Sequence, residues 1–357
     1  MPAKCAPVIE KGPSPLVYTG RFSWATLPSL PLSIAIQHHI THHQHLPTYS
    51  LKMGSTSDMP PQELKGILVA VITPFASDQK SIDEAAYKAH IDRLIEAGVH
   101  GLVPGGSTGE FTVLSSQERK QLVELTVKYA AGRVPVVAGV GDTSTERAVD
   151  LAVHAARTGA AAVMVVPPFY DAPNLSELHD FLSEIHTASK LPICYYNIPS
   201  ATGVSLSPAE IADLAKVGVK YLKDTSGNAP SLTNLLFDKD EHITTFNGWD
   251  TLTFYGLAAG AKGSVWGATN IIPELSMQLW DAIAVKGDLT RGRKLWKKIW
   301  PICNFLESGN YAAAVKTGME LRGWCTGGLR KPFSLIKGER KIELVGLLKS
   351  AGVPVVE

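Results

Sequence analysis

Eight short apolar segments, separated by helical patterns, are the feature that most restricts the fold of this chain. They cover residues 66–73, 101–104, 134–140, 161–166, 192–196, 219–222, 243–246 and 263–266. Apolar residues run through each segment without regular alternation, which predicts strands that are buried on both faces. Strands of this kind, alternating with helices, are typical of a parallel sheet.

Helical patterns fill most of the intervals between these segments. We expect helices at residues 81–97, 115–131, 143–158, 176–189 and 251–259, and another that opens at Ser207. Ser81 with Glu84, and Ser115 with Glu118, have the spacing of capping boxes. Eight units in about 220 residues predict the α/β class, as a (β/α)8 TIM barrel. An open doubly wound sheet is the alternative, but it would need a glycine fingerprint after the first strand, where residues 73–75 read TPF.

The two ends of the chain differ from this repeating part. After Asn270 the pattern contains helices only, at residues 272–286, 289–308, 311–321 and 341–350, so we expect a barrel over 61–270 and an appended helical layer over 271–357. The basic stretch 291–298 (RGRKLWKK) has interleaved apolar residues, which favours a helix with one solvated face over a polyanion site. Residues 1–60 are expected to be a disordered or targeting extension, in which the histidine-rich stretch 38–45 is interpreted as a biased tract rather than a metal site.

Composition excludes several classes of function. The 357 residues carry 34 basic and 33 acidic side chains, a formal charge of +1, which gives no signature of nucleic-acid or membrane-surface binding. The longest apolar runs are too short to span a membrane. Four widely spaced cysteines predict reduced thiols and a cytoplasmic protein, with a mitochondrial location as the alternative if residues 1–52 form a transit peptide.

Polar residues gather where the predicted strands end, which is where parallel barrels place their chemistry. Residues 105–110 (GGSTGE) offer backbone amides and the hydroxyls of Ser107 and Thr108, a suitable seat for a carboxylate. Tyr196 and Lys223 end the fifth and sixth strands. A buried lysine that loses its proton can form a Schiff base, whereas a lone lysine at a strand end is more often a solvated charge.

The strand ends carry no histidine, aspartate and glutamate cluster that would hold a catalytic metal, so we predict no metal site. An iminium on Lys223 is the expected electron sink, and no other cofactor is predicted.

Five motifs in combination resemble the pyruvate-dependent class I aldolase superfamily that contains dihydrodipicolinate synthase and N-acetylneuraminate lyase. They are GSTGE at 106–110, YNIP at 196–199, KDTSG at 223–227, GAKG at 260–263 and RKPF at 330–333, and the resemblance covers residues 64–350. It implies a Schiff base between Lys223 and pyruvate or a 2-oxo acid. It also implies that Tyr196 is the acid/base and that Ser107 and Thr108 hold the substrate carboxylate.

The same resemblance extends to the surroundings of the lysine and to assembly. Gly248 and Val265 match positions that line the lysine, and Thr225 belongs to the motif directly after it. Tyr170 matches a tyrosine that reaches into the neighbouring subunit's site and completes a tyrosine–hydroxyl–tyrosine relay. Homotetramers are usual in this superfamily.

Departures from the family pattern narrow the substrate. Ala201 stands where dihydrodipicolinate synthases carry an arginine that binds the carboxylate of the aldehyde substrate. The stretch that ends in Asp250 resembles N-acetylneuraminate lyase, but Thr251 follows where the lyase has a glutamate. If Trp266 points into the substrate pocket, it would leave less room for a long sugar chain. We therefore expect cleavage of a short 2-oxo acid, such as a 2-keto-3-deoxy sugar acid or 4-hydroxy-2-oxoglutarate. The alternatives are 4-hydroxy-tetrahydrodipicolinate synthase or N-acetylneuraminate lyase activity, or a non-catalytic relative that binds 2-oxo acids.

Overall fold

Eight parallel strands form the centre of the computed structural model, which describes residues 63–356. They are β1 (Gly66–Ala70), β2 (Gly101–Val103), β3 (Val137–Gly139), β4 (Ala162–Val165), β5 (Ile193–Asn197), β6 (Val219–Asp224), β7 (Thr244–Asn247) and β8 (Gly263–Trp266). Their order is β2-β1-β8-β7-β6-β5-β4-β3. A parallel bridge between Leu102 and Val136 joins the first and last of these, which closes the sheet into the predicted TIM barrel.

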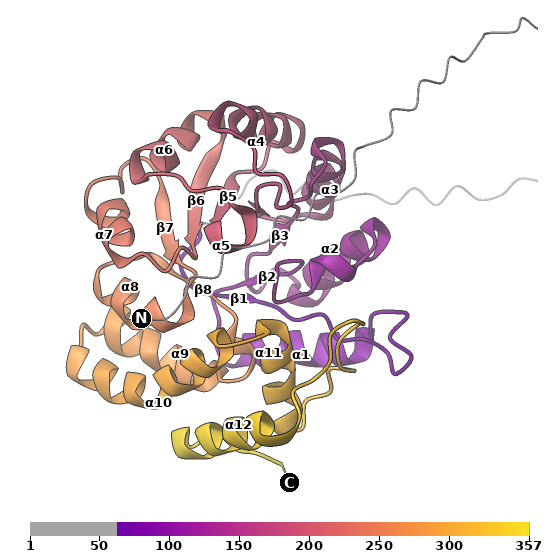
Figure 1. Ribbon diagram of the computed structural model, residues 1–357, viewed down its shortest axis with the longest axis vertical. Coiled ribbons are helices and arrows are strands. Elements are labelled where there is room, and N and C mark those ends of the chain that lie inside the picture. Colours follow the sequence, from indigo (N-terminus) through magenta and orange to yellow (C-terminus); the bar gives the residue numbers. More distant parts are fainter. Residues whose placement is uncertain (1–62, 357) are drawn as a thin grey trace, which may run out of the picture. The chain divides into compact units, whose positions relative to one another are not determined.

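Helices surround the barrel and cover its outer face (Figure 1). They are α1 (Glu84–Glu96), α2 (Ser116–Ala130), α3 (Thr145–Thr158), α4 (Leu175–Ser189), α5 (Pro199–Thr202), α6 (Pro208–Asp213), α7 (Ala229–Phe237) and α8 (Thr253–Ala258). The sequence pattern did not predict α7, although Asn228 caps it and proline occupies its first turn.

Local hydrogen bonds set where these helices begin. Ser115 and Glu118 form the predicted capping box of α2. The predicted box at Ser81 is wrong, because α1 begins after Asp83, whose side chain accepts from the Ala86 N–H. Residues 81 and 82 instead belong to a loop that an antiparallel bridge between Phe75 and Ile82 holds in an extended conformation.

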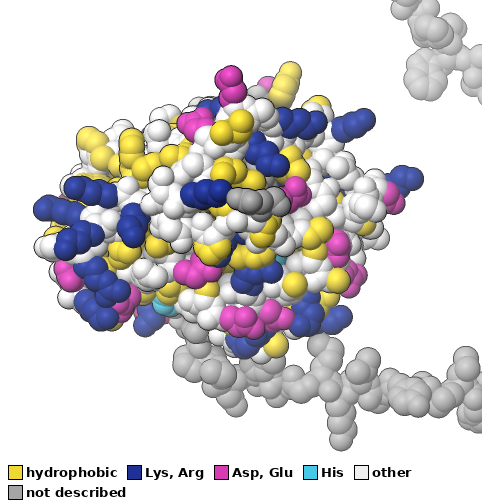
Figure 2. Space-filling model, turned by 90° about the horizontal axis from the view of Figure 1, so that it is seen from below, with side chains coloured by type: hydrophobic (Ala, Val, Ile, Leu, Met, Phe, Trp, Pro, Cys, Tyr) yellow, Lys and Arg dark blue, Asp and Glu magenta, His cyan; other side chains and the backbone are white. Residues whose placement is uncertain are grey.

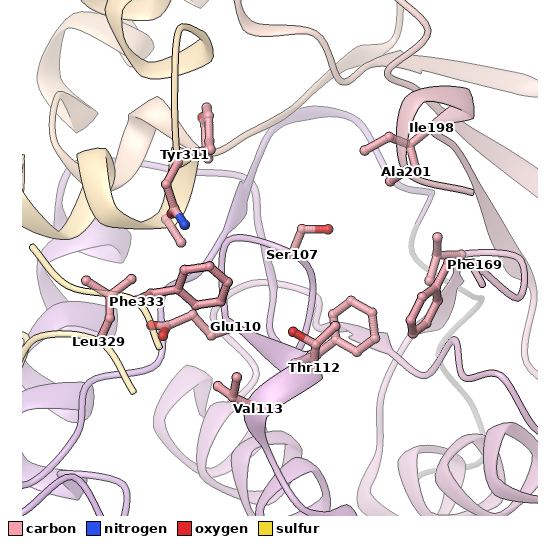
Figure 3. A pocket seen from close by; sticks show the side chains of 14 residues that line it. Ser107, Glu110, Thr112, Val113, Phe169, Ile198, Ala201, Tyr311, Leu329 and Phe333 are labelled. Carbon is pink, nitrogen blue, oxygen red and sulfur yellow. The ribbon is translucent and has the colours of Figure 1, made fainter. Parts of the chain in front are cut away.

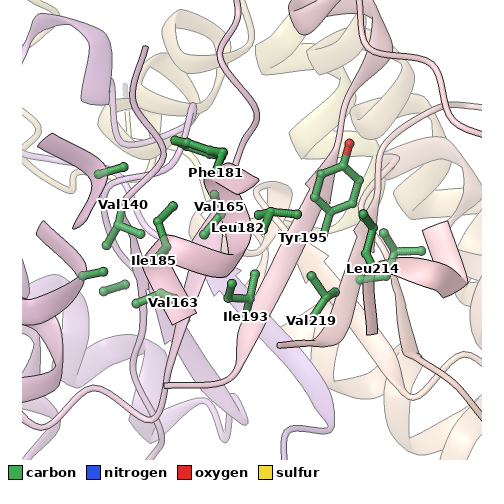
Figure 4. Close-up of a cluster of buried hydrophobic side chains, with 14 of the residues drawn as sticks. Val140, Val163, Val165, Phe181, Leu182, Ile185, Ile193, Tyr195, Leu214 and Val219 are labelled. Atoms are coloured by element: carbon green, nitrogen blue, oxygen red, sulfur yellow. The ribbon is translucent and has the colours of Figure 1, made fainter. Parts of the chain in front are cut away.

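Apolar side chains on the two sides of the strands make separate cores. One cluster fills the barrel interior, with Leu68, Val103, Met164 and Phe246 among its members. Another lies between the strands and α3, α4 and α6, as Figure 4 shows for Val163, Ile193 and Leu182. Because both faces of the strands pack in this way, neither face could carry a regular polar pattern, which is why the sequence shows continuous apolar runs.

The last four helices are α9 (Pro273–Trp280), α10 (Leu289–Glu307), α11 (Tyr311–Leu321) and α12 (Gly338–Ala351). They form the predicted helical layer, which lies beside α8 at one side of the barrel (Figure 1). Basic residues of α10 are exposed, whereas Leu295 and Trp296 pack against the buried cluster of this layer, which confirms the solvated face. Figure 2 shows basic side chains gathered on the side of the molecule where α10 lies.

The segment predicted to be an extension, residues 1–60, lies outside the described residues. Within 63–356, no helix combines the length and the apolar character that a membrane crossing needs.

Candidate active site

Lys223 and Tyr196 lie on neighbouring strands at the same level of the barrel. The β-ladder pairs them directly, and both side chains are almost fully buried, with 5% and 4% of their surface exposed. The Nζ atom of Lys223 lies 3.8 Å from the centroid of the Tyr196 ring. The backbone hydrogen bonds of β5 and β6 therefore hold an amine and a phenol next to each other inside the barrel mouth.

Gly248 leaves the space that the lysine side chain occupies. A Cβ atom at this position would lie 2.7 Å from Cγ of Lys223 and 2.3 Å from Oγ1 of Thr225. Cγ of Lys223 cannot move away easily, because the side chain is buried and Cγ lies close to the backbone of β6. The requirement for glycine here is thus steric rather than conformational.

The loop that carries Ser107 and Thr108 follows β2 and is tightly folded at the barrel mouth. Gly105 has a φ of 71°, and a Cβ on Gly109 would come within 2.9 Å of the Val71 carbonyl oxygen. The hydroxyl of Thr73 donates to the Gly109 carbonyl at 2.7 Å. Thr108 is buried and Ser107 is exposed, so the loop presents a buried hydroxyl and an accessible one.

A buried ion pair supports this loop from the helical layer. Lys316 of α11 is fully buried and contacts the carboxylate of Glu110, the last residue of the GSTGE motif. The Lys316 ammonium also donates to the Gly328 carbonyl at 2.7 Å and lies 4.2 Å from the Phe75 ring centroid. The position of the loop thus depends on residues far away in the sequence.

Tyr196, Lys223 and the loop that carries Ser107 border a cavity of about 220 Å³. The residues that line it include Ser107, Thr108, Tyr196, Lys223, Thr225, Gly248, Asp250 and Val265, all of them predicted site residues. A second cavity of about 320 Å³ shares Ser107, Ile198 and Tyr311 with the first. In Figure 3, Tyr311 and Phe333 lie on one side of this second cavity, and Ile198, Ala201 and Phe169 lie on the other.

Two predicted residues lie elsewhere. Trp266 is fully buried outside the barrel interior, in the core of the helical layer, where its ring centroid is 6.3 Å from that of Trp296. The expectation that Trp266 narrows the substrate pocket is therefore wrong, since its neighbours Val265 and Gly267 line the cavity instead. Tyr170 is 90% exposed and lines neither cavity, so its role in a neighbouring subunit stays a prediction.

Two residues that the sequence did not single out, Glu307 and Tyr311, also line the smaller cavity. The Tyr311 hydroxyl donates to Oδ2 of Asp250 at 2.6 Å. Glu307 accepts hydrogen bonds from the backbone N–H and the hydroxyl of Thr251, at 3.1 and 2.8 Å. Glu307 is the last residue of α10 and Tyr311 is the first residue of α11, so a search of strand ends does not reach them.

Burial raises the pKa of the two carboxyl groups at this side of the cavity, Asp250 and Glu307. Desolvation raises the pKa of Asp250 to about 7, although the Tyr311 hydroxyl and the charge of Lys223 both favour the carboxylate. Desolvation also raises the pKa of Glu307, whose bonds to Thr251 act in the opposite direction. Asp250 can therefore gain or lose a proton near neutral pH.

The described part of the chain holds no group of three histidine, cysteine, aspartate or glutamate side chains arranged to bind a metal ion. The histidine-rich stretch 38–45 lies outside that part.

Comparison with known proteins identifies this architecture. A model of the dihydrodipicolinate synthetase family matches residues 63–351. The chain belongs to the dihydrodipicolinate synthetase family. Enzymes of this family are lyases of the class I aldolase type that form a covalent Schiff base between pyruvate and a lysine, so this protein is a carbon–carbon lyase rather than a non-catalytic relative.

Individual relatives match almost over their whole length. The 4-hydroxy-tetrahydrodipicolinate synthase of Methanopyrus kandleri is 34% identical over 81% of this chain and 99% of its own. That of Thermomicrobium roseum is 35% identical over 80% of this chain and 94% of its own. The crystal structure of dihydrodipicolinate synthase from Aquifex aeolicus has a TM-score of 0.78 and 30% identity, and it covers 82% of this chain and all of the other.

Proposed function

We propose that this family member is a Schiff-base lyase that reversibly cleaves a short 2-oxo acid into pyruvate and an aldehyde, with Lys223 as the nucleophile. The observation that carries the proposal is the contact of the Lys223 amine with the Tyr196 ring inside a cavity that also contains Ser107 and Thr108. The amine, the phenol and the hydroxyls are the groups that such a cleavage needs. A related dihydrodipicolinate synthase, from Acinetobacter baumannii, has been solved in complex with pyruvate.

The reaction begins with the unprotonated amine of Lys223, which adds to the ketone carbon of the substrate. Loss of water gives the iminium. The C3–C4 bond then breaks, and its electron pair moves toward the iminium nitrogen to leave an enamine. The C4 hydroxyl gives its proton to the Tyr196 oxygen while the phenol proton passes along the hydroxyl relay, and the aldehyde departs. Protonation of the enamine at C3 and addition of water release pyruvate and restore the lysine.

The proposed substrates are a 2-keto-3-deoxy sugar acid or 4-hydroxy-2-oxoglutarate. Support for a substrate other than that of dihydrodipicolinate synthase comes from Ala201, which lines the larger cavity where the resemblance calls for an arginine. Without a guanidinium, a carboxylate on the aldehyde loses a charge-assisted pair worth about 1.5–3 kcal/mol.

A second candidate is 4-hydroxy-tetrahydrodipicolinate synthase activity, which is favoured by the names of the relatives at 32–35% identity. The two candidates use the same iminium and differ in the aldehyde that meets the enamine. Steady-state kcat/KM with each 2-oxo acid, compared with pyruvate and the aldehyde of the synthase, separates them.

The proposed assembly is a homotetramer. Tyr170 supports it, because an aromatic side chain that is 90% exposed beside the barrel mouth gains burial when another subunit covers it. A structural relative is described as the first monomeric variant of a dihydrodipicolinate synthase.

The cytoplasmic location stays a prediction.

Borohydride trapping tests the proposed nucleophile. The protein is incubated with pyruvate and borohydride, digested, and analysed by mass spectrometry for a reduced adduct on Lys223. Lys223→Ala is expected to lose the adduct. Lys220→Ala, on the same strand but exposed, is the matched control and is expected to keep it. An adduct on another lysine, or none on folded protein, would contradict the proposal.

A further inference from the structure

An acidic wall borders the smaller cavity on the side that the helical layer supplies. We define this wall as Asp250, Glu307 and Tyr311, all of which line the cavity together with Lys223. Asp250 is only 4% exposed, and Tyr311 fixes its carboxyl group through the 2.6 Å hydrogen bond. Glu307 is fixed through Thr251, the residue after Asp250. The wall is therefore a preorganised part of the cavity and not a group of mobile surface carboxylates.

The two cavities offer no positive charge to a second carboxylate. Of the described residues that line them, Lys223 alone is basic. Lys316 is buried against Glu110, and Arg330 is paired with Glu118. Once Lys223 has become an iminium beside the carboxylate of pyruvate, no cation remains for the substrate partner.

The groups around Asp250 come from four elements. Lys223 on β6 stabilises its carboxylate, and Tyr311 on α11 donates to it. Glu307 and Cys303 on α10 interact with it electrostatically, and the indole N–H of Trp266 on β8 favours its ionised form. A protonated Asp250 can donate to the carbonyl oxygen of an aldehyde, and an ionised one can accept from a hydroxyl. The ionised form repels an approaching anion, and the protonated form gives an anion no counter-charge.

We propose that this wall selects a neutral, hydroxylated aldehyde as the partner of pyruvate and discriminates against aldehydes that carry a carboxylate. The inference rests on the proposed function and narrows it. Cleavage of a 2-keto-3-deoxy sugar acid gives a neutral hydroxyaldehyde, whereas 4-hydroxy-2-oxoglutarate gives the anion glyoxylate. The first class of substrate is therefore assigned to this site.

Glycolaldehyde and glyoxylate provide a size-matched test, because each has two carbons and they differ in charge. Initial rates of aldol addition to pyruvate give kcat/KM for both aldehydes with the full chain. Like charges across a binding site cost several kcal/mol, so we expect glycolaldehyde to be favoured by at least about tenfold. The double variant Asp250→Asn with Glu307→Gln keeps the shape of the wall without its charge and is expected to reduce this ratio by about tenfold or more. Glu241→Gln, an exposed acid between α7 and β7, is the control and is expected to leave the ratio unchanged.

Trapping of the pyruvate adduct on the same samples separates the two proposals. A missing adduct on Lys223 overturns the proposed function. If the adduct forms normally but the wild-type protein does not use glycolaldehyde faster than glyoxylate, the proposed role of the wall is overturned and the proposed function is not. That comparison needs no variant, so a double variant that fails to fold does not remove the test. An unchanged ratio in a folded double variant also overturns the role of the wall.

Discussion

The substitution Glu110→Gln removes one charge of the buried ion pair that supports the GSTGE loop. Its partner Lys316 is fully buried, and the variant leaves that ammonium without a carboxylate. Breaking a buried pair in this way commonly costs about 3–5 kcal/mol, because the remaining charge is uncompensated. Lys316, however, has a way to lose its charge.

Desolvation lowers the pKa of Lys316 from 10.5 to about 8, even though Glu110 raises it. At pH 7 the ammonium is thus only about one pH unit from losing its proton, and one unit corresponds to about 1.4 kcal/mol. A neutral amine no longer needs the Glu110 carboxylate. The electrostatic part of the destabilisation at pH 7 is therefore limited to about 1–2 kcal/mol.

The sign of the pH dependence follows from the same shift. Glu110 raises the pKa of Lys316, so its loss lowers that pKa further below the value in the unfolded chain; the folded variant then binds fewer protons than the unfolded variant, and its stability rises with pH. The cost of deprotonating Lys316, which limits the destabilisation, falls by about 1.4 kcal/mol for each unit by which the pH rises. We expect Glu110→Gln to lose about 3 kcal/mol at pH 6 and almost nothing at pH 8.

Urea denaturation of the wild type and the variant at pH 6, 7 and 8 measures these differences. Glu343→Gln on the exposed side of α12 is the control, and it should show a small loss at every pH. A loss of about 3–5 kcal/mol that does not depend on pH would refute the reasoning, because it would show that Lys316 stays charged in the variant.

Three other substitutions test separate parts of the structure. Gly248→Ala places a methyl group 2.7 Å from Cγ of Lys223, so borohydride trapping with pyruvate should fall sharply while circular dichroism still shows a folded barrel. Leu182→Ala leaves a cavity between α4 and the barrel, and chemical denaturation should show a loss of about 2–5 kcal/mol; a loss below 1 kcal/mol would mean that the site collapses without cost. Asn174→Ala removes the capping box of α4 and should cost about 1 kcal/mol in the same assay, with unchanged pyruvate adduct formation.

The barrel could be predicted because its strands are buried on both faces, which leaves a distinctive run of apolar residues. The nine-residue helix α7 was missed because it is short and has only two fully buried residues, Leu232 and Leu235. The start of α1 was misplaced because Ser81 satisfies the spacing of a capping box, but an antiparallel bridge between Phe75 and Ile82 holds the chain extended there. The spacing of a capping box does not report this bridge.

The site was predictable where it depends on strand ends and not where it depends on the helical layer. Lys223, Tyr196 and the Ser107 loop follow strands, so their convergence follows from the barrel. Glu307 and Tyr311 reach the cavity because α10 and α11 pack against the short segments that follow β7 and β8, residues 250–252 and 268–270, in a way that the sequence pattern does not encode. Trp266 could have been excluded from the sequence, because successive side chains on a strand point to opposite faces and Val265 was already expected to face inward.

Because Tyr196 pairs directly with Lys223, the residues that carry the chemistry can stay unchanged while the residues that select the substrate evolve. The backbone ladder of two central strands sets the distance between amine and phenol, so most changes outside β5 and β6 leave it intact. Two of the three residues of the acidic wall, in contrast, lie at the ends of peripheral helices, since Glu307 is the last residue of α10 and Tyr311 is the first of α11. Mutations there can redirect the enzyme to a new aldehyde without rebuilding its nucleophile, which gives this barrel a short evolutionary path between related activities.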